Sequence, residues 1–303
     1  MGIRLYREPR LDHPVLVATW PGIGNIGIIA VDTLRELLGA EEFGEIEPWH
    51  FFYPKRVLIR NGVLEHLQFP ASKFYFARFG GKDFVFFLGE EQPGEGRRPY
   101  AEGKKAYEMA NLVVDVAERF QCDRIYTSGA AVALTHHTAK PRVWAVPTSA
   151  SLLKEVRACG NIVLMSDIEG RSGQGTITGL NGLLLGVAKR RGLEAICLMG
   201  EIPVYLQGLP LSYPKASKSV LEVLAKCLRI EVNLDGLDQL DRKVERGIEE
   251  FYAQIPSEMR EQLERLKQAA CAEPREPGPI TEVEQQRIMD DVEKFFRKRG
   301  GGD

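Results

Sequence analysis

Apolar runs that end in a glycine turn and lead into an amphipathic segment recur along this chain of 303 residues. The first is the run 15–19 (VLVAT), followed by a turn at 20–27 (WPGIGNIG) and by a helix expected at 28–38. Further strands are expected at 123–129, 142–148, 161–167 and 193–201, and further helices at 99–120, 149–160, 176–192 and 214–228. Strands and helices that alternate in this way form crossover units with parallel strand pairing. The pattern therefore predicts an α/β fold.

Two hairpin patterns add antiparallel strands to this fold. An Asn-Gly pair separates the apolar runs 56–60 and 63–69, and this arrangement is the strongest short-range signal for a hairpin. A second hairpin is expected at 73–89, around a Gly-Gly pair. We therefore predict a mixed, largely parallel sheet flanked by helices, similar to phosphorylase and hydrolase folds, with a helical C-terminal extension.

The pattern changes towards the C-terminus. Apolar residues then recur at steps of three and four, as in a coiled-coil seam, at Leu237, Leu240, Val244, Ile248, Phe251 and Ile255. After a proline-rich linker, an amphipathic helix carries Phe295 and Phe296 on its apolar side. The expected units are a core domain, a helical extension, the linker and the C-terminal helix with its tail, at 1–233, 234–271, 272–279 and 280–303. The two apolar stripes either mediate self-association or cover the chain's own core, and the sequence leaves both interpretations open.

Composition and charge disfavour two classes of partner. The chain is 44% apolar and 27% charged, as is usual for a globular protein, and its net charge is -2. Because phosphate neutralisation supplies most nucleic-acid affinity, no nucleic acid is expected as a partner. The N-terminal segment MGIRLYREPRLDHP has no apolar core of a signal peptide, and no run approaches membrane-spanning length. We therefore expect a cytoplasmic protein that binds no membrane.

The five cysteines are Cys122, Cys159, Cys197, Cys227 and Cys271. They are far apart, odd in number and include no C-x-x-C pair, so the sequence indicates neither a disulfide framework nor a zinc site. Free thiols are common among buried apolar residues. We therefore expect structural thiols in a reducing compartment, and no metal.

The turn at 20–27 contains G-x-G-x-x-G, the pattern of a dinucleotide-binding turn. Such a site also needs a second parallel strand that ends in an acidic residue about twenty positions later. In the corresponding window, 39–52, no apolar strand leads into the acidic residues, which are Glu41, Glu42, Glu45 and Glu47. A glycine-rich loop at 170–179 could hold an anion, but it has no lysine in the phosphate-binding position. We therefore expect a turn where helix and strand pack closely, with no cofactor.

His136 and His137 follow a strand that is expected to end at Gly129, and open α/β sheets bind ligands beyond the carboxyl ends of their strands. Adjacent side chains cannot both face one site in regular structure, so at most one of the two histidines is expected to act. A hydrolase would add a carboxylate that orients the histidine and a serine nucleophile, for which the candidates are Asp167, Glu169, Ser128 and Ser172. The sequence lacks the G-x-S-x-G elbow, and we assign no catalytic residue.

Three separate elements carry a family resemblance. The first strand leads into P-G-x-G-N-[VI]-G at 21–27, G-x-[IL]-x-G-L-N-x-x-L is matched at 175–184, and 200–216 leads into a helix. Together they resemble the proteasome-assembly-chaperone 2 family, whose archaeal and bacterial members are also described as ATP-grasp-like. The resemblance covers about 14–237. It implies an α/β fold similar to that of purine nucleoside phosphorylases, oligomerisation and, in eukaryotes and some archaea, help in the assembly of proteasome α-subunits.

No catalytic residue is carried over by this resemblance. We therefore expect a non-enzymatic assembly chaperone or scaffold that acts as a homo-oligomer and binds a protein client, for which proteasome α-subunits are the candidate. The candidate surfaces for self-association are the seam from Leu237 to Ile255 and the helix around Phe295 and Phe296. The alternative is an enzyme or binding protein for a nucleotide, nucleoside or phosphate. Its candidate pocket residues are Gly24, Asn25, Ser128, Gly129 and His137.

Overall fold

The computed structural model describes residues 2–94, 103–167, 175–255, 257, 260–261 and 263. Within these residues one sheet contains nine strands, in the order β1 (Ile3–Leu5), β3 (Glu41–Ile46), β6 (Ser72–Phe79), β7 (Lys82–Gly89), β2 (Val15–Thr19), β8 (Arg124–Ala133), β11 (Ala195–Pro203), β9 (Val143–Pro147) and β10 (Ile162–Leu164). The central strands β7, β2, β8 and β11 pair in parallel. Strands β1, β3 and β6 join through antiparallel pairs, and β9 is antiparallel to β11. The mixed α/β sheet predicted from the sequence is confirmed.

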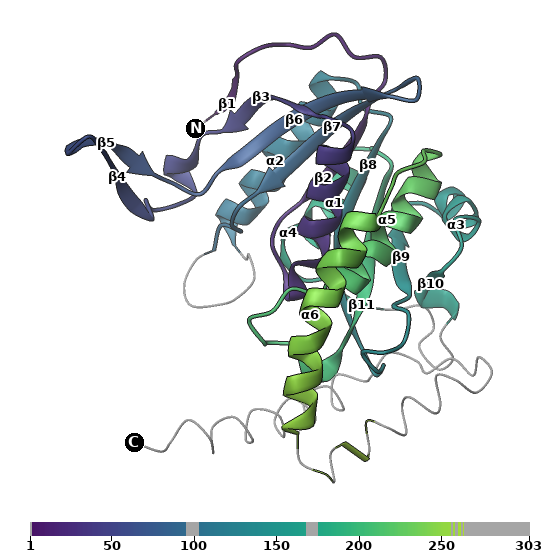
Figure 1. The fold of residues 1–303 in the computed structure, drawn as a ribbon. Helices are drawn as coiled ribbons and strands as arrows, with labels where there is room; N and C mark the ends of the chain where they lie inside the picture. Colours follow the sequence, from purple (N-terminus) through teal and green to yellow (C-terminus); the bar gives the residue numbers. More distant parts are fainter. Residues whose placement is uncertain are drawn as a thin grey trace.

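Helices cover both faces of this sheet (Figure 1). On one face lie α1 (Ile26–Leu37), α3 (Ala150–Arg157) and α5 (Pro214–Leu228), and on the other lie α2 (Lys104–Arg119) and α4 (Gly179–Arg190). Strand β2 shows why two layers form. Val17 belongs to the core under α1 and α5, whereas its neighbours Leu16 and Ala18 belong to the core under α2 and α4. A strand that is apolar on both faces is typical of a parallel sheet between two helical layers.

Strand β8 is longer than the sequence predicts. It continues past Gly129 to Ala133 and pairs with β11 along its whole length, Ser128 with Leu198 and Gly129 with Met199. The continuous pairing with β11 outweighs the local tendency of glycine to end a strand. The expectation that a loop begins at Gly129 is therefore wrong, and both candidate pocket residues of this segment lie within the sheet.

Strand β3 forms where the sequence pattern indicated no strand. Its two apolar residues, Phe43 and Ile46, are buried, while Glu42 on β3 pairs with Lys73 of β6 at 2.8 Å. Four acidic residues within 41–47 conceal this strand from a pattern search, because the apolar positions are few. Since β3 runs antiparallel to β6, it does not supply the parallel strand that a dinucleotide site requires.

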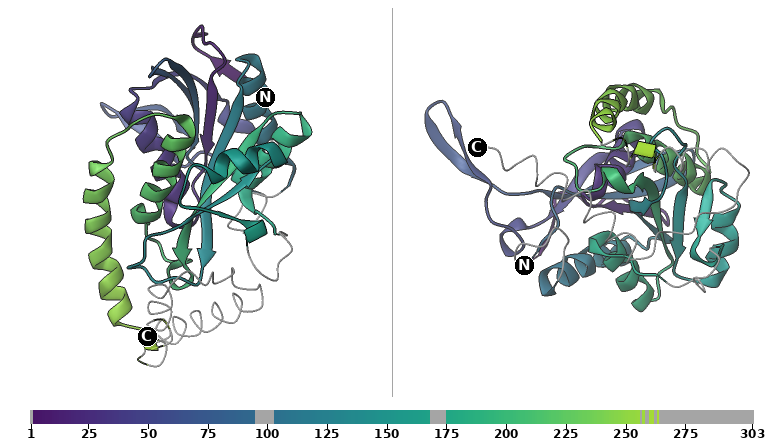
Figure 2. Two further views of the ribbon diagram at one scale, coloured as in Figure 1. Left: turned by 90° about the vertical axis from the view of Figure 1, so that its right-hand side faces the viewer. Right: turned by 90° about the horizontal axis from the view of Figure 1, so that it is seen from below.

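The hairpin β4 (Arg56–Arg60) and β5 (Val63–Gln68) forms as predicted, but as a separate two-stranded sheet. Asn61 and Gly62 have positive φ angles of 53° and 79°, as a type I′ turn requires. The hairpin, which we call the arm, projects from the body of the molecule at the left of Figure 1 and of the right-hand view in Figure 2. The expectation that both hairpins extend the main sheet is wrong for this one.

Helix α6 (Asp235–Ala253) packs against α5. Its seam faces the chain's own core, where the buried residues are Leu237, Ile248 and Ile255 and the partly buried ones are Val244 and Phe251. The helices are also connected by an ion pair of 2.5 Å between Lys218 Nζ and Asp238 Oδ1. Leu240 alone of the seam is exposed, at 38%. Phe295, Phe296 and the linker lie outside the described residues.

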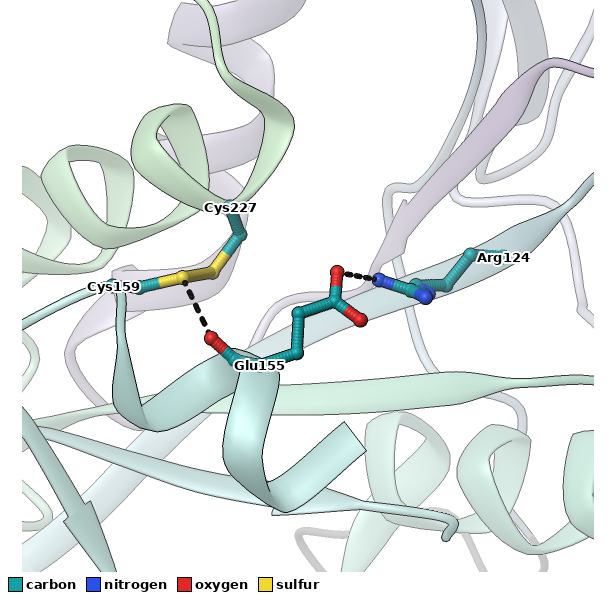
Figure 3. Close-up of a disulfide and its surroundings, with 4 residues drawn as sticks. All are labelled: Arg124, Glu155, Cys159 and Cys227. Carbon is teal, nitrogen blue, oxygen red and sulfur yellow. Dashed lines mark hydrogen bonds and ion pairs between the residues drawn. A yellow bond between two sulfur atoms is a disulfide. The ribbon is translucent and has the colours of Figure 1, made fainter. Parts of the chain in front are cut away.

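Two cysteines contradict the expectation of free thiols. Cys159, which follows α3, and Cys227, in the last turn of α5, form a disulfide with their Cα atoms 5.7 Å apart (Figure 3). The pair is separated by 68 positions, so no spacing motif signals it. Cys122 and Cys197 are buried free thiols, as expected, and burial raises the pKa of each to about 12. Cys271 lies outside the described residues.

Candidate functional site

The glycine turn connects β2 to α1 through a short 3₁₀ segment at Ile23–Asn25. Gly24 and Asn25 both adopt left-handed backbone conformations, with φ angles of 61° and 51°. A Cβ at Gly24 would lie 2.9 Å from Ile202 Cδ1 and 3.2 Å from Tyr213 Cβ. Glycine is therefore required at this position by its backbone angle and by its packing, without reference to a phosphate group.

Tyr213 occupies the space between the glycine turn and the histidine loop. Its backbone N–H donates to the Gly24 carbonyl at 2.7 Å, and its hydroxyl donates to the His137 carbonyl at 3.4 Å. The side chain is buried, and burial raises the pKa of its hydroxyl. The residues proposed to line a ligand pocket, Gly24 and His137, thus lie on either side of a buried tyrosine. Sequence reasoning missed Tyr213, although it lies within the third element of the family resemblance.

Ser128 is a second pocket candidate that the fold places in a packed interior. The residue is buried, and its carbonyl oxygen would lie 2.5 Å from a Cβ at Gly27. Helix α1 therefore approaches β8 at a distance that only glycine allows. Gly129, the next residue, lies near the side chains of Asn181 and Met199. The geometry of these residues is that of a helix packed closely against a strand.

Both histidines are buried, and their rings lie together with centroids 4.2 Å apart. The Tyr205 hydroxyl accepts a hydrogen bond from the His137 backbone N–H at 2.8 Å and lies 2.7 Å from His137 Nδ1. The ring of Tyr252, on α6, lies 5.1 Å from His136 and 4.9 Å from His137. The two rings lie side by side because this loop is irregular, so the limit stated for regular structure does not apply to it. The cluster ties the histidine loop to α6.

The remaining hydrolase candidates do not assemble around His137 in the described part of the chain. Asp167, in the turn after β10, pairs with Arg157 at the end of α3 at a distance of 2.6 Å. Glu169 and Ser172 lie outside the described residues. Among the residues that the structure describes, no group of three His, Cys, Asp or Glu side chains could hold a metal ion.

The glycine-rich loop considered as an anion site leads into α4. The N-terminus of α4 forms hydrogen bonds with side chains of this chain. Gln92 accepts a hydrogen bond from the Leu180 N–H at 3.0 Å and donates to the Pro21 carbonyl at 2.6 Å. The Asn181 side chain accepts hydrogen bonds from the Trp20 N–H at 3.3 Å and from the Thr127 hydroxyl at 3.2 Å. These bonds hold the described start of α4 against the glycine turn. Sequence reasoning gave no role to Gln92.

A cavity of about 610 Å³ lies at the opposite, amino ends of the central strands. Its charged residues bond to one another or to neighbouring segments: His13 lies 3.1 Å from Asp123, and Arg124 lies 2.9 Å from Glu194. Asp83 accepts a hydrogen bond from a backbone N–H at 2.8 Å. Open α/β sheets bind ligands at the carboxyl ends of their strands, so this end is not the expected ligand site.

The arm carries several exposed apolar side chains. Cross-strand pairs place Val57 opposite Leu67 and Ile59 opposite Leu64, so these four side chains share one face of the hairpin. Their exposed fractions are 45%, 50%, 67% and 65%. We call these four residues the apolar arm face. The other face carries Arg56 bonded to Gln68, and further pairs that include polar residues.

The base of the arm adds exposed aromatic side chains. Trp49 and Tyr53, which precede β4, are 60% and 89% exposed. The Trp49 ring packs edge-on against Phe69, directly after β5. His50 bonds to Glu108 of α2 at 2.7 Å and so attaches this segment to the body of the molecule. The arm and its base are therefore anchored, while their apolar side chains face outward.

The family model that matches this chain is that of the PAC2 family, over residues 16–252. The chain belongs to the PAC2 family. It is 30% identical to the uncharacterized protein MJ1210 of Methanocaldococcus jannaschii, over 88% of this chain and 90% of that protein. Among solved structures it is similar to Pyrococcus furiosus PbaB, an archaeal proteasome activator, with a TM-score of 0.69 and 28% identity over 82% of this chain and 98% of the other. It shares its fold with Pyrococcus furiosus PbaA, an archaeal homolog of proteasome-assembly chaperone, at a TM-score of 0.59 and 22% identity over 88% and 99% of the two chains.

The three elements behind the predicted PAC2 resemblance contact one another in the structure. Asn181 of the second element bonds to Trp20 beside the first, and Tyr213 of the third bonds to Gly24 of the first. Within the third element, a Cβ at Gly200 would lie 3.0 Å from the Ala216 carbonyl oxygen. In this PAC2 chain the motif residues therefore make the contacts that hold β2, α1, α4 and α5 together.

In the described part of the chain, none of the helices has the length and the apolar character that a membrane span requires.

Proposed function

We propose that this chain is a non-enzymatic assembly chaperone or scaffold that acts in the cytoplasm as a homo-oligomer and binds protein clients. Its membership of the PAC2 family supports a chaperone role. The proposed clients are proteasome α-subunits, because PbaB is described as an archaeal proteasome activator and PbaA as a homolog of proteasome-assembly chaperone. A chaperone of this kind offers apolar surface that a client or a second subunit covers.

The observation that carries the proposal is the outward-facing apolar surface of the arm and its base. Val57, Ile59, Leu64 and Leu67 share one face, and Trp49 and Tyr53 lie at the base. Contiguous exposed apolar patches mark sites of protein or membrane interaction. Because a type I′ turn and an anchored base hold the arm, this surface is a defined part of the fold.

The packing at the glycine turn argues against the alternative of a nucleotide- or phosphate-binding enzyme. A catalytic cleft needs polar groups that converge on an open space. Here Tyr213 fills the space between Gly24 and His137, and Gln92 bonds the N-terminus of α4. Close packing explains Gly24 and Gly27 of the glycine turn.

The test of the proposed function is an assembly reaction with purified archaeal proteasome α-subunits. The subunits are diluted from denaturant with or without an equimolar amount of this chain, and ring formation is followed by size-exclusion chromatography with light scattering. The proposal predicts a larger yield of rings, or a faster approach to the final yield, in the presence of the chain. An equal amount of serum albumin is the control. Unchanged yield and rate in the presence of the chain would contradict the proposal.

A further inference from the structure

The arm is a hairpin with nothing packed on its apolar face in the described part of the chain. A single two-stranded hairpin is marginally stable in water, and independent stability requires a further strand or packing against another element. The pairs Val57–Leu67 and Ile59–Leu64 form one apolar surface, although the strand register shifts between Leu58 and Ile59. A second apolar surface is the natural complement of such a face.

The four residues of the apolar arm face are all uncharged, and the charged residues of the arm lie at its base or on its other face. Lys55 Nζ lies 2.5 Å from Glu91 at the base, and Arg60 Nε lies 3.4 Å from Glu65 near the tip. In a two-fold contact the same surface patch is used on both subunits. A net charge in that patch would therefore repel the like charge of the other subunit. A strongly acidic or basic client would instead bind best to a surface that carries a net charge of the opposite sign. The uncharged apolar arm face therefore fits a second copy of this chain, because no like charges meet in such a contact.

The available area also fits a second copy. A stable interface buries roughly 800 Å² on each partner. Aromatic side chains bury about 150–250 Å² each, so Trp49 and Tyr53 together with the four residues of the apolar arm face approach that size.

We propose that the apolar arm face binds the apolar arm face of a second copy, so that two arms form a two-fold contact of the homo-oligomer. This inference rests on the proposed function, whose homo-oligomer it describes, and it assigns the face to self-association rather than to the client. Burial of the four aliphatic side chains on each subunit stabilises the contact. The arm projects from the body of the molecule (Figure 2).

The experiment compares variants by sedimentation velocity over a range of concentrations. Ile59→Thr/Leu64→Thr and, near the base, Val57→Thr/Leu67→Thr remove apolar surface while keeping a residue with high strand propensity. Val63→Thr is the matched control: this residue is 68% exposed on the same hairpin but pairs with Arg60 on the opposite face. Circular dichroism checks that each variant keeps the wild-type secondary structure. Binding of each variant to archaeal proteasome α-subunits is measured separately by light scattering.

The proposal predicts that both double variants shift the concentration of half-dissociation upward at least about tenfold, which corresponds to about 1.4 kcal/mol. Val63→Thr should keep the wild-type value. Unchanged mass in both double variants would overturn the inference. If in that case the variants also lose α-subunit binding, the arm binds the client, and the proposed chaperone function stands. A wild-type chain that is monomeric at every concentration would overturn both the inference and the homo-oligomer.

Discussion

Gly27 lies so close to β8 that a Cβ at this position would come within 2.5 Å of the Ser128 carbonyl oxygen and 2.7 Å of the Thr19 hydroxyl oxygen. Gly27 is the last glycine of the G-x-G-x-x-G pattern. The closeness of helix α1 to β8 therefore accounts for this glycine. Gly24, in the middle of the pattern, is explained by its positive φ angle and by Tyr213 beside it.

Gly27→Ala should destabilise the protein because the neighbouring atoms include backbone that cannot move aside. Overpacking of a core typically lowers the free energy of unfolding by about 1–3 kcal/mol, and we expect the upper part of that range. Urea unfolding followed by circular dichroism measures the loss. Gly22→Ala is the matched control from the same turn, because a Cβ there would meet nothing within 4 Å and the φ angle is an extended −158°. Equal stability of the two variants would show that the approach of α1 to β8 is not what requires glycine.

The seam of α6 provides a second matched pair. Leu237 is buried in the chain's own core, whereas Leu240, one turn away on the same helix, is 38% exposed. Leu237→Ala should lower the free energy of unfolding by about 2–5 kcal/mol, as is usual for a buried leucine. Leu240→Ala should change it by less than about 0.5 kcal/mol. Thermal unfolding measures both, and sedimentation velocity should give the wild-type mass for Leu240→Ala. A lower mass for that variant would assign α6 to self-association.

The Cys159–Cys227 disulfide should stabilise the fold chiefly by restricting the unfolded chain. A disulfide typically contributes about 2–4 kcal/mol, more for longer loops, and this one closes a separation of 68 residues. We expect the double variant Cys159→Ser/Cys227→Ser to lose about that amount in urea unfolding without reductant. The wild-type chain in reductant should match the variant, and the variant itself should be insensitive to reductant. An equal response of both proteins to reductant would contradict the assignment.

Beside the disulfide, Arg124 Nη1 donates a hydrogen bond to Glu155 Oε1 at 2.6 Å (Figure 3). This hydrogen bond lowers the pKa of the Glu155 carboxyl below its usual range. A carboxyl whose pKa is lowered by folding contributes stability above its unfolded pKa of about 4.3, and this contribution is lost as the pH falls through the lower pKa of the folded state. Because Glu155 is half exposed, the contribution should not exceed about 1 kcal/mol.

NMR titration of the Glu155 carboxyl carbon measures this pKa directly. We expect a midpoint below about 4.3 in the wild-type chain and a return towards the usual value in Arg124→Met. Glu108 is the internal control, because His50 rather than Arg124 lowers the pKa of its carboxyl. A Glu155 midpoint that Arg124→Met leaves unchanged would show that this hydrogen bond does not set the pKa.

The sequence predicts those parts of the fold that are determined by local pattern. The run 15–19, the Asn61-Gly62 turn and the helix at Pro214–Leu228 all form where expected. Strand β3 was missed because half of its six residues are glutamates, and β8 was cut short at Gly129 because its continuation depends on pairing with β11. Both depend on partners that are distant in the sequence.

The candidate site was less predictable for the same reason. The family resemblance is confirmed by the match to the PAC2 model. Nothing in the local sequence, however, indicates that Tyr213 lies between Gly24 and His137, or that Cys159 meets Cys227. The arm was predicted as a hairpin, but its separation from the main sheet, which leaves its apolar face exposed, follows only from the three-dimensional arrangement.

The central claim is that this chain acts on protein clients as a homo-oligomer, and native mass spectrometry tests it most directly. The purified chain is mixed with archaeal proteasome α-subunits, and parallel samples receive Mg-ATP, NAD or phosphate instead. We predict a complex that contains at least two copies of this chain together with α-subunits, and no adduct with the small molecules. A chain that remains free of α-subunits but binds one of the nucleotides or phosphate would contradict the account and support the ligand-binding alternative.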